Sequence, residues 1–235
     1  MLWRRRWKLR YELWHRLLRD DVVAVDYPII LYGSEGGGWH LPGELIKSDW
    51  LVYDFGVGVD ITLDVALIER HRCTIHAFDS TPKAIAFMEN QSLPGFHFHP
   101  VGVWNENATI KFWEPRHANY ASYSALNLHG TTEYVECEVK TIKTLAAELG
   151  HEQIDMIKMD IEGAEQRVIP DLLAEGIYPT LLCVEFDQAD DIVSLLSLRT
   201  FLTSLRLHRD ILQAGYQLIY KNGTNVIYLH SAFTG

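Results

Sequence analysis

From residue 50 onward, short apolar runs alternate with segments in which apolar residues recur at helical spacing. The pattern predicts strands at 50–55, 74–79 and 96–103, with helices at 60–71 and 82–90 between them. Alternating strands and helices at this interval are typical of βαβ units, whose strands form a parallel sheet. Ligands of such sheets bind at the carboxyl ends of the strands, so we expect the functional residues there.

The alternation breaks after residue 107. A polar stretch rich in Tyr, Ser, Asn and His, "PRHANYASYSALNLHGTT", separates two predicted strands, and connections of this length are often functional. The elements predicted for this half are strands at 108–114, 133–142 and 178–187, a strand that runs into a helix at 154–165, a short helix at 142–150 and a long helix at about 191–214.

The end of the chain, "GYQLIYKNGTNVIYLH", contains two apolar, aromatic-rich runs around Asn222-Gly223. Asn-Gly between two β patterns is the strongest short-range hairpin signal, so the last two strands are predicted to be antiparallel. We therefore expect an α/β fold with a Rossmann-like, doubly wound, mostly parallel sheet and an antiparallel final strand. This domain is predicted to span 21–235, with its cofactor-binding half at about 48–105.

Residues 1–20 are predicted to form a separate basic, aromatic and amphipathic helix. An apolar stripe recurs among its arginines at helical spacing, made of Trp3, Trp7, Tyr11, Trp14 and Leu18. Two interpretations stay open. Residues 1–19 make peripheral contact with an anionic membrane surface, or the stripe packs on the domain or on a second subunit. The sequence does not fix the oligomeric state.

The composition of the 235 residues, 48% hydrophobic and 22% charged, is typical of a soluble globular protein. The net charge of −10 is unevenly distributed, because residues 1–19 hold seven Arg or Lys and one Glu whereas the remainder is strongly acidic. An acidic domain disfavours a nucleic-acid partner. The three cysteines show no paired spacing and no secretory signal is recognised, so we expect a reducing, cytoplasmic location.

The segment "DFGVGVD", Asp54 to Asp60, joins the first predicted strand to its helix. Gly56 and Gly58 match the first two glycines of GxGxxG, but Ile61 occupies the third position. Asp60 at the helix start would repel a pyrophosphate bound at the same amides. The loop therefore favours a cofactor without phosphate and with a positive charge, such as S-adenosylmethionine (SAM).

Asp79 ends the second predicted strand, 21 residues after Gly58, where a carboxylate can accept hydrogen bonds from ribose hydroxyls. This feature is shared with NAD sites and does not by itself choose between the cofactors. By analogy alone, Val101 and Gly102, at the end of the third predicted strand, are placed near the adenine.

Five blocks in order, "VYDFGVGVDITLD", "HAFDSTP", "VGVW", "IDMIKMDIEGAEQRVI" and "PTLLCVEF", resemble the FkbM-type SAM-dependent methyltransferases. The resemblance covers roughly 50–187, and its most specific block is K-x-D-x-E-G-A-E. It implies a class I methyltransferase fold and O-methylation of a hydroxyl on a sugar, glycan or natural product. Asp79 departs from the Glu that is common in the family, and Asp60 from an Asn.

Methylation of an alcohol requires removal of the hydroxyl proton, so a general base is expected near the methyl donor. Asp160 and Glu162, at the end of the predicted strand "MIKM", are the candidates for base or substrate contact. Lys158 lies on the same strand face as Asp160 and favours its ionised form. The alternative is a purely structural pair of Lys158 with Asp160.

Further candidates surround this pair. Glu185 and Asp187 on the next strand, together with Asp160, have the oxygen chemistry of a Mg²⁺ site, although an enzyme without a metal is favoured. Substrate contacts are predicted for Glu185, for His117 and Tyr120 in the long polar stretch, and for Trp39 in the glycine-rich segment "SEGGGWHLPG".

Three functions remain open. The first is a SAM-dependent O-methyltransferase acting on a small-molecule or glycan acceptor. The second is an NAD(P)-dependent oxidoreductase, which Asp60, the missing third glycine and the terminal hairpin disfavour. The third is a non-catalytic, membrane-attached binding module that uses the fold as a scaffold.

Overall fold

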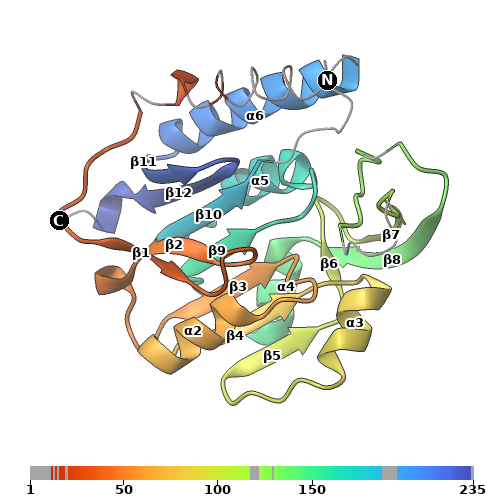
Figure 1. Ribbon diagram of the computed structural model, residues 1–235, viewed down its shortest axis with the longest axis horizontal. Coiled ribbons are helices and arrows are strands. Elements are labelled where there is room, and N and C mark those ends of the chain that lie inside the picture. Colours follow the sequence, from red (N-terminus) through yellow and green to blue (C-terminus); the bar gives the residue numbers. More distant parts are fainter. Residues whose placement is uncertain are drawn as a thin grey trace.

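The computed structural model describes residues 12, 14, 16–18, 21–116, 122–128, 130–186 and 195–233. Its centre is a seven-stranded sheet with the strand order β11-β12-β10-β9-β3-β4-β5 (Figure 1). The strands are β3 (Leu51–Phe55), β4 (Thr74–Phe78), β5 (Phe96–His99), β9 (Met156–Met159), β10 (Leu181–Glu185), β11 (Tyr216–Asn222) and β12 (Asn225–His230).

The sheet is parallel except at β12, which runs antiparallel to both β10 and β11. Asn222 pairs with Asn225, so Gly223 and Thr224 form the hairpin turn, and Gly223 adopts a φ of +64° that favours glycine. The predicted fold class, a doubly wound and mostly parallel sheet with an antiparallel final strand, is confirmed.

Helices cover both faces of this sheet (Figure 1). Leu63 and Leu67 of α2 pack on one face with Val52 and Ile75. The opposite face holds Ile157 and Leu182 and is covered by later helices. The helices of the first face are α2 (Thr62–His71) and α3 (Pro82–Met88), and those of the second are α4 (Ile142–Leu149), α5 (Glu165–Ala174) and α6 (Leu195–Gln213).

Local signals set the boundaries of α4. Thr141 precedes it, and its side chain accepts a hydrogen bond from the backbone N–H of Thr144. Gly150 ends it with a φ of +73°, the left-handed conformation that stops a helix. These boundaries match the predicted helix at 142–150.

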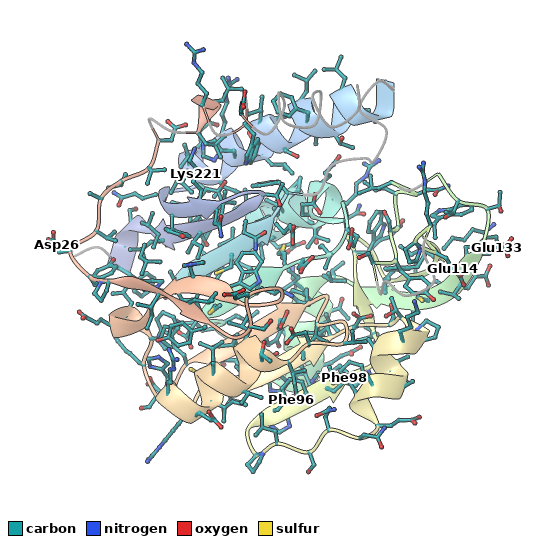
Figure 2. All side chains as sticks on the ribbon, in the orientation of Figure 1. Asp26, Phe96, Phe98, Glu114, Glu133 and Lys221 are labelled. Carbon is teal, nitrogen blue, oxygen red and sulfur yellow. The ribbon has the colours of Figure 1, made fainter. Side chains whose placement is uncertain are left out.

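The predicted strand at 96–103 is two strands in the structure. The chain turns at Pro100, which has no N–H to donate, and Val101 donates to the carbonyl of His99 instead. After this turn β6 (Gly102–Val103) leaves the central sheet and joins a separate three-stranded sheet, in the order β6-β8-β7, with β7 (Ala108–Trp113) and β8 (Tyr134–Lys140). Figure 2 shows Glu133 at the outer edge of this second sheet.

The glycine-rich segment at 34–43 is partly a strand. β1 (Ile29–Tyr32) and β2 (Trp39–Pro42) form an antiparallel hairpin that packs on the α2 face of the main sheet. Short 3-10 turns follow β2 and β12, at η1 (Gly43–Leu45) and η2 (Ser231–Phe233).

The described residues of the N-terminal segment include helical positions at 12, 14, 16 and 17. Trp14 and Leu18 are both buried, and the Trp14 ring lies 5.3 Å from Phe186 and 6.3 Å from Phe201 of α6. These two members of the predicted stripe therefore pack on the domain, whereas Trp3, Trp7 and Tyr11 lie outside the described residues. Within the described part of the chain, no helix combines the length and apolar character needed to cross a bilayer.

Candidate active site

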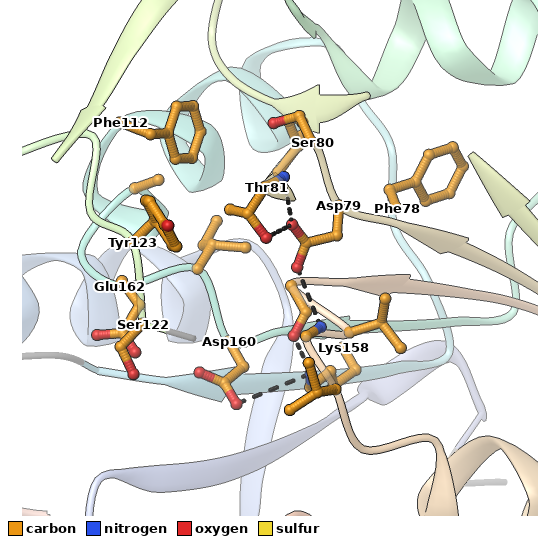
Figure 3. A pocket seen from close by; sticks show the side chains of 18 of the residues that line it. Phe78, Asp79, Ser80, Thr81, Phe112, Ser122, Tyr123, Lys158, Asp160 and Glu162 are labelled. Atoms are coloured by element: carbon orange, nitrogen blue, oxygen red, sulfur yellow. Dashed lines mark hydrogen bonds and ion pairs between the residues drawn. The ribbon is translucent and has the colours of Figure 1, made fainter. Parts of the chain in front are cut away.

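A cavity of about 200 Å³ opens at the carboxyl ends of β3, β4 and β9, between the main sheet and the three-stranded sheet (Figure 3). Five of the predicted cofactor residues line it, together with both predicted catalytic residues. They are Gly56, Gly58, Asp60, Asp79, Gly102, Asp160 and Glu162.

The glycine loop after β3 requires both of its glycines. Gly56 has a φ of +78°, and a Cβ there would lie 1.8 Å from the carbonyl oxygen of Asp160. Gly58 has a φ of +57°, but a Cβ would meet open space. Gly56 thus allows two strand ends to approach closely, while Gly58 leaves backbone bare at the cavity wall.

Asp79, directly after β4, holds this loop in place. One carboxylate oxygen accepts the N–H of Gly58 at 3.0 Å, and the other accepts the N–H and hydroxyl of Thr81 at 2.8 and 2.7 Å. Burial raises the pKa of Asp79, against the opposing effect of these hydrogen bonds. A carboxylate has about four acceptor positions, so roughly one is left for a ligand.

Asp60 faces the β1–β2 hairpin as well as its own helix. It accepts hydrogen bonds from the backbone N–H of Thr62 and from the hydroxyl groups of Thr62 and Ser34. Burial alone would raise the pKa of Asp60, but these hydrogen bonds hold it below the usual value. Asp60 therefore places a negative charge at the cavity and ties the glycine loop to the hairpin.

A buried ion pair lies behind the cavity. Lys158 on β9 is 2.9 Å from Asp54 on β3, and its ammonium also donates to the carbonyl oxygen of Gly56 at 3.1 Å. Burial alone would lower the pKa of Lys158, but Asp54 and Asp160 raise it above the usual value. Burial and the neighbouring charge of Asp54 raise the pKa of Asp64 well above its usual range, so Asp64 is neutral.

Asp160 follows β9 directly and lies 3.8 Å from Lys158, as their shared strand face predicts. Glu185 on β10 lies beside Asp160, and two neighbouring carboxylates repel each other. Burial and the charge of Asp160 raise the pKa of Glu185 to about 8. Glu185 is therefore mostly protonated at neutral pH, and it accepts a hydrogen bond from the hydroxyl of Thr224 at 3.0 Å.

The turn that carries Glu162 has an unusual backbone. Glu162 adopts a φ of +51°, which non-glycine residues rarely do, and Gly163 follows at +94°. The hydroxyl of Ser124, from the long polar stretch, donates to the Glu162 carbonyl oxygen at 2.7 Å. Strained turns held by their surroundings concentrate at functional sites, so this geometry supports a role for Glu162.

Two aromatic side chains form a wall that sequence patterns did not identify as a unit. Phe112 of β7 and Tyr123 of the long polar stretch both line the cavity (Figure 3). Tyr123 belongs to the long polar stretch that was expected to be functional, whereas Phe112 belongs to a strand with no distinguishing signal. Other lining residues that the sequence did not single out are Gly37, Val57, Val59, Phe78, Ser80, Thr81, Val103, Ser122, Ile161 and Ala164.

Several predicted residues lie elsewhere. Asp54 is buried beneath the loop, and Val101 does not line the cavity. Trp39 is only 2% exposed and packs in the core under the β1–β2 hairpin. Glu185 does not line the cavity, but it lies beside Asp160, which does. The remaining predicted residues, His117, Tyr120 and Asp187, lie outside the described residues.

The cavity suits a cofactor with positive charge. Its described lining carries four carboxylates and one ammonium, that of Lys158. The carboxylates are Asp60, Asp79, Asp160 and Glu162. A pyrophosphate would be repelled here, whereas a ribose, an ammonium and a sulfonium find acceptors. The donor set thus fits SAM. Among the described residues, no group of three side chains is arranged to hold a metal ion.

The model of the methyltransferase FkbM domain matches residues 58–218. Human probable methyltransferase-like protein 24 is 26% identical over 139 residues, which cover 59% of this chain and 32% of that protein. The rat protein of the same name is 24% identical over 126 residues, covering 54% and 29%. The chain therefore spans about a third of the length of the curated relatives it matches.

Solved structures are similar at low identity. A fibrillarin/Nop5p complex aligns with a TM-score of 0.45 and 11% identity, covering 78% of this chain and 73% of the other. Human N-acetylserotonin methyltransferase, solved in complex with SAM, aligns with a TM-score of 0.37 and 13% identity, covering 82% and 52%.

Proposed function

The chain belongs to the methyltransferase FkbM domain family, and we propose that it transfers a methyl group from SAM to a hydroxyl of a sugar, glycan or natural-product acceptor. One observation carries the proposal. A single cavity brings together a glycine loop held by Asp79 and a strained turn that presents Asp160 and Glu162. The glycine loop suits the methyl donor, SAM. The strained turn suits an acceptor hydroxyl that must lose its proton.

The cofactor is held by β3 and β4. The remaining acceptor position of Asp79 receives a ribose hydroxyl, while the bare backbone at Gly58 permits close approach. Phe112 and Tyr123 offer apolar ring surface to the adenine. When bound, SAM supplies an electrophilic methyl carbon attached to a sulfonium.

The acceptor is held by the turn after β9. The Asp160 side chain is 34% exposed and has one of two roles. Either Asp160 accepts the proton of the acceptor hydroxyl, or it orients the hydroxyl while Glu162 accepts that proton. Lys158 and protonated Glu185 fix the Asp160 carboxylate from two sides. Alignment of the hydroxyl oxygen within about 3 to 3.5 Å of the methyl carbon is the main catalytic contribution of such a site.

Binding of S-adenosylhomocysteine tests the donor assignment. We expect it to raise the melting temperature of the full chain, because a ligand that binds only the folded state stabilises it, whereas NAD⁺ should not. Stabilisation by NAD⁺ alone would refute the proposal. No effect of either ligand would favour the non-catalytic binding module instead.

Transfer of a tritiated methyl group tests the acceptor class. Mono- and oligosaccharides and hydroxylated natural products form one panel, and RNA and protein form the other. The acidic lining of the cavity supports labelling of the first panel only. The same assay with and without EDTA tests the Mg²⁺ site, for which we expect no dependence.

We also retain the cytoplasmic location as part of the proposal. Cys73, Cys137 and Cys183 are all buried and none forms a disulfide, which suits a reducing compartment. Fractionation of cells that express the tagged full-length protein would check it.

A further inference from the structure

The outward face of α6 carries large apolar side chains in solvent. Leu198 is 48% exposed and Leu202 is 55% exposed, and they lie one helical turn apart. They line a shallow open groove with Arg199, Thr203 and Arg206. A helix face that is only solvated is usually polar, so this exposed pair of leucines indicates a surface that a partner covers.

Two described residues of the N-terminal segment contact α6. The Trp14 ring contacts that of Phe201. A carboxylate oxygen of Asp21 lies 3.1 Å from Nε2 of His208, within hydrogen-bond distance. The second pair lies seven residues after the first on both segments, so the two run parallel. Leu17, three residues after Trp14 on this segment, is 46% exposed.

The layer formed by α6 and the N-terminal segment carries exposed arginines. Arg199, Arg206 and Arg209 are exposed on α6, where Asp210, 3.7 Å from Arg206, is the acidic residue of the described helix, and the adjoining N-terminal segment adds the exposed Glu12 and Asp21. Residues 1–19 hold seven Arg or Lys and one Glu, and their described part is anchored to α6 through Trp14. Of the basic residues of 1–19, Arg16 is described and is exposed, and the chain as a whole has a net charge of −10, so the exposed arginines of this layer stand against an acidic background.

We propose that the α6 face, defined as Leu17, Leu198, Arg199, Leu202 and Arg206, docks on an anionic lipid bilayer. An anionic bilayer offers apolar depth for the leucines and negative headgroups for the arginines at the same surface. A nucleic acid would match the positive charge of the arginines but would offer no apolar layer to the leucines. The acidic remainder of the chain would be repelled by the same headgroups, which orients the molecule with α6 toward the membrane.

Sedimentation of the full chain with lipid vesicles tests the proposal. We expect binding to phosphatidylcholine vesicles that contain about 30 mol% phosphatidylserine and little binding to pure phosphatidylcholine, at about 0.1 M salt. Arg199→Glu with Arg206→Glu should weaken partitioning by at least about 20-fold, since each basic residue contributes about fivefold. Leu198→Ser with Leu202→Ser should weaken it by about tenfold.

Matched variants elsewhere on the surface serve as controls. Ile30→Ser with Tyr178→Ser removes apolar side chains of similar exposure, and Lys47→Glu with Arg167→Glu makes the same change in net charge. Both should bind vesicles like the wild type, and all variants should keep the wild-type melting temperature.

Three results would overturn the proposal. The wild type fails to bind anionic vesicles, the α6 variants bind as well as the controls, or the wild type is a dimer that the leucine substitutions dissociate. The last result, measured by analytical ultracentrifugation, would assign the α6 face to a second copy of the chain. None of these results depends on SAM binding or methyl transfer.

Discussion

Lys158 stands between two strand ends, with its ammonium 2.9 Å from Asp54 and 3.1 Å from the carbonyl oxygen of Gly56. The ammonium, the Asp54 carboxylate and the neutral Asp64 carboxyl together carry no net charge, which makes their burial tolerable. Through Gly56 the ion pair fixes the loop that lines the cavity. Asp54 therefore supports the loop from below and does not itself line the cavity.

Lys158→Met should destabilise the protein strongly. It leaves Asp54 as a buried charge without its cation, and breaking such a pair costs about 3 to 5 kcal/mol. Urea unfolding measures the loss. Lys143→Met is the matched control, because its ion pair with Glu175 lies at the surface and its loss should change stability little. Equal effects of the two substitutions would contradict the role of the buried pair.

The two loop glycines should respond differently to alanine. In Gly56→Ala the new Cβ collides with backbone, at 1.8 Å from the Asp160 carbonyl oxygen, so β3 and β9 must separate. In Gly58→Ala the Cβ enters open space, and the positive φ costs about 1 to 2 kcal/mol.

We expect Gly56→Ala to unfold at much lower temperature. Gly58→Ala should stay folded but bind S-adenosylhomocysteine weakly, because its methyl group projects at the cavity wall. Melting curves with and without S-adenosylhomocysteine separate the effects. A Gly56→Ala variant as stable as Gly58→Ala would show that the strand ends are not in close contact.

Sequence patterns located the parts of this site that are local. The strand ends, the glycine loop, Asp79 and Asp160 follow from hydrophobic periodicity and from the rule that parallel strands present ligands at their carboxyl ends. The terminal hairpin followed from Asn222-Gly223. Each of these signals lies within a few residues of the feature it predicts.

The parts that sequence patterns missed depend on contacts between distant residues. Phe112 reaches the cavity because β7 pairs with β8 in a second sheet, and β6 joins that sheet only because the chain turns at Pro100. Trp39 was expected to contact substrate, yet its hairpin packs on the main sheet and buries it. Such pairings are long-range and leave no local pattern.

Asp79→Ala should weaken S-adenosylhomocysteine binding by about 10- to 100-fold, because a charge-assisted hydrogen bond and the anchor of Gly58 are both lost. Thr81→Val is the control, since it removes only the hydroxyl donor and keeps the backbone N–H donor. Calorimetric titration gives both affinities. Unchanged affinity of Asp79→Ala would remove the ribose assignment.

A histidine cluster outside the cavity should make stability depend on pH. His76 is hydrogen-bonded to His99 at 2.9 Å and stacks on His97, and burial followed by the neighbouring histidines lowers the pKa of His76 to about 4. The unfolded chain then binds more protons than the folded one between about pH 4 and 6.5, so stability falls as pH falls through this window.

His76→Phe keeps an aromatic ring but does not titrate. Relative to it, the wild type should lose of the order of 2 kcal/mol between pH 6.5 and 4. Urea unfolding at several pH values gives the difference, and parallel curves for the two proteins would contradict the prediction.

Glu185 and Asp160 should be distinguishable by their amide variants. Glu185 is mostly protonated at neutral pH, so Glu185→Gln keeps a neutral side chain of the same shape and should retain most methyl transfer at pH 7. Asp160→Asn and Glu162→Gln remove the carboxylates that we propose contact the acceptor, and they should lower turnover by about 100-fold or more, with smaller effects on S-adenosylhomocysteine affinity. A fully active Glu162→Gln would exclude it as the base and leave Asp160.

Glu185→Gln should also change the pH dependence of stability in the opposite sense to His76→Phe. The folded state holds the Glu185 proton up to about pH 8, whereas the unfolded chain releases it near its ordinary value. Wild-type stability due to this group is therefore full at low pH and is lost as pH rises from about 4.5 to 8. Relative to Glu185→Gln, the wild type should lose on the order of 4 kcal/mol over that range, as measured by urea unfolding. A constant difference between the two proteins would mean that folding does not raise the pKa of Glu185.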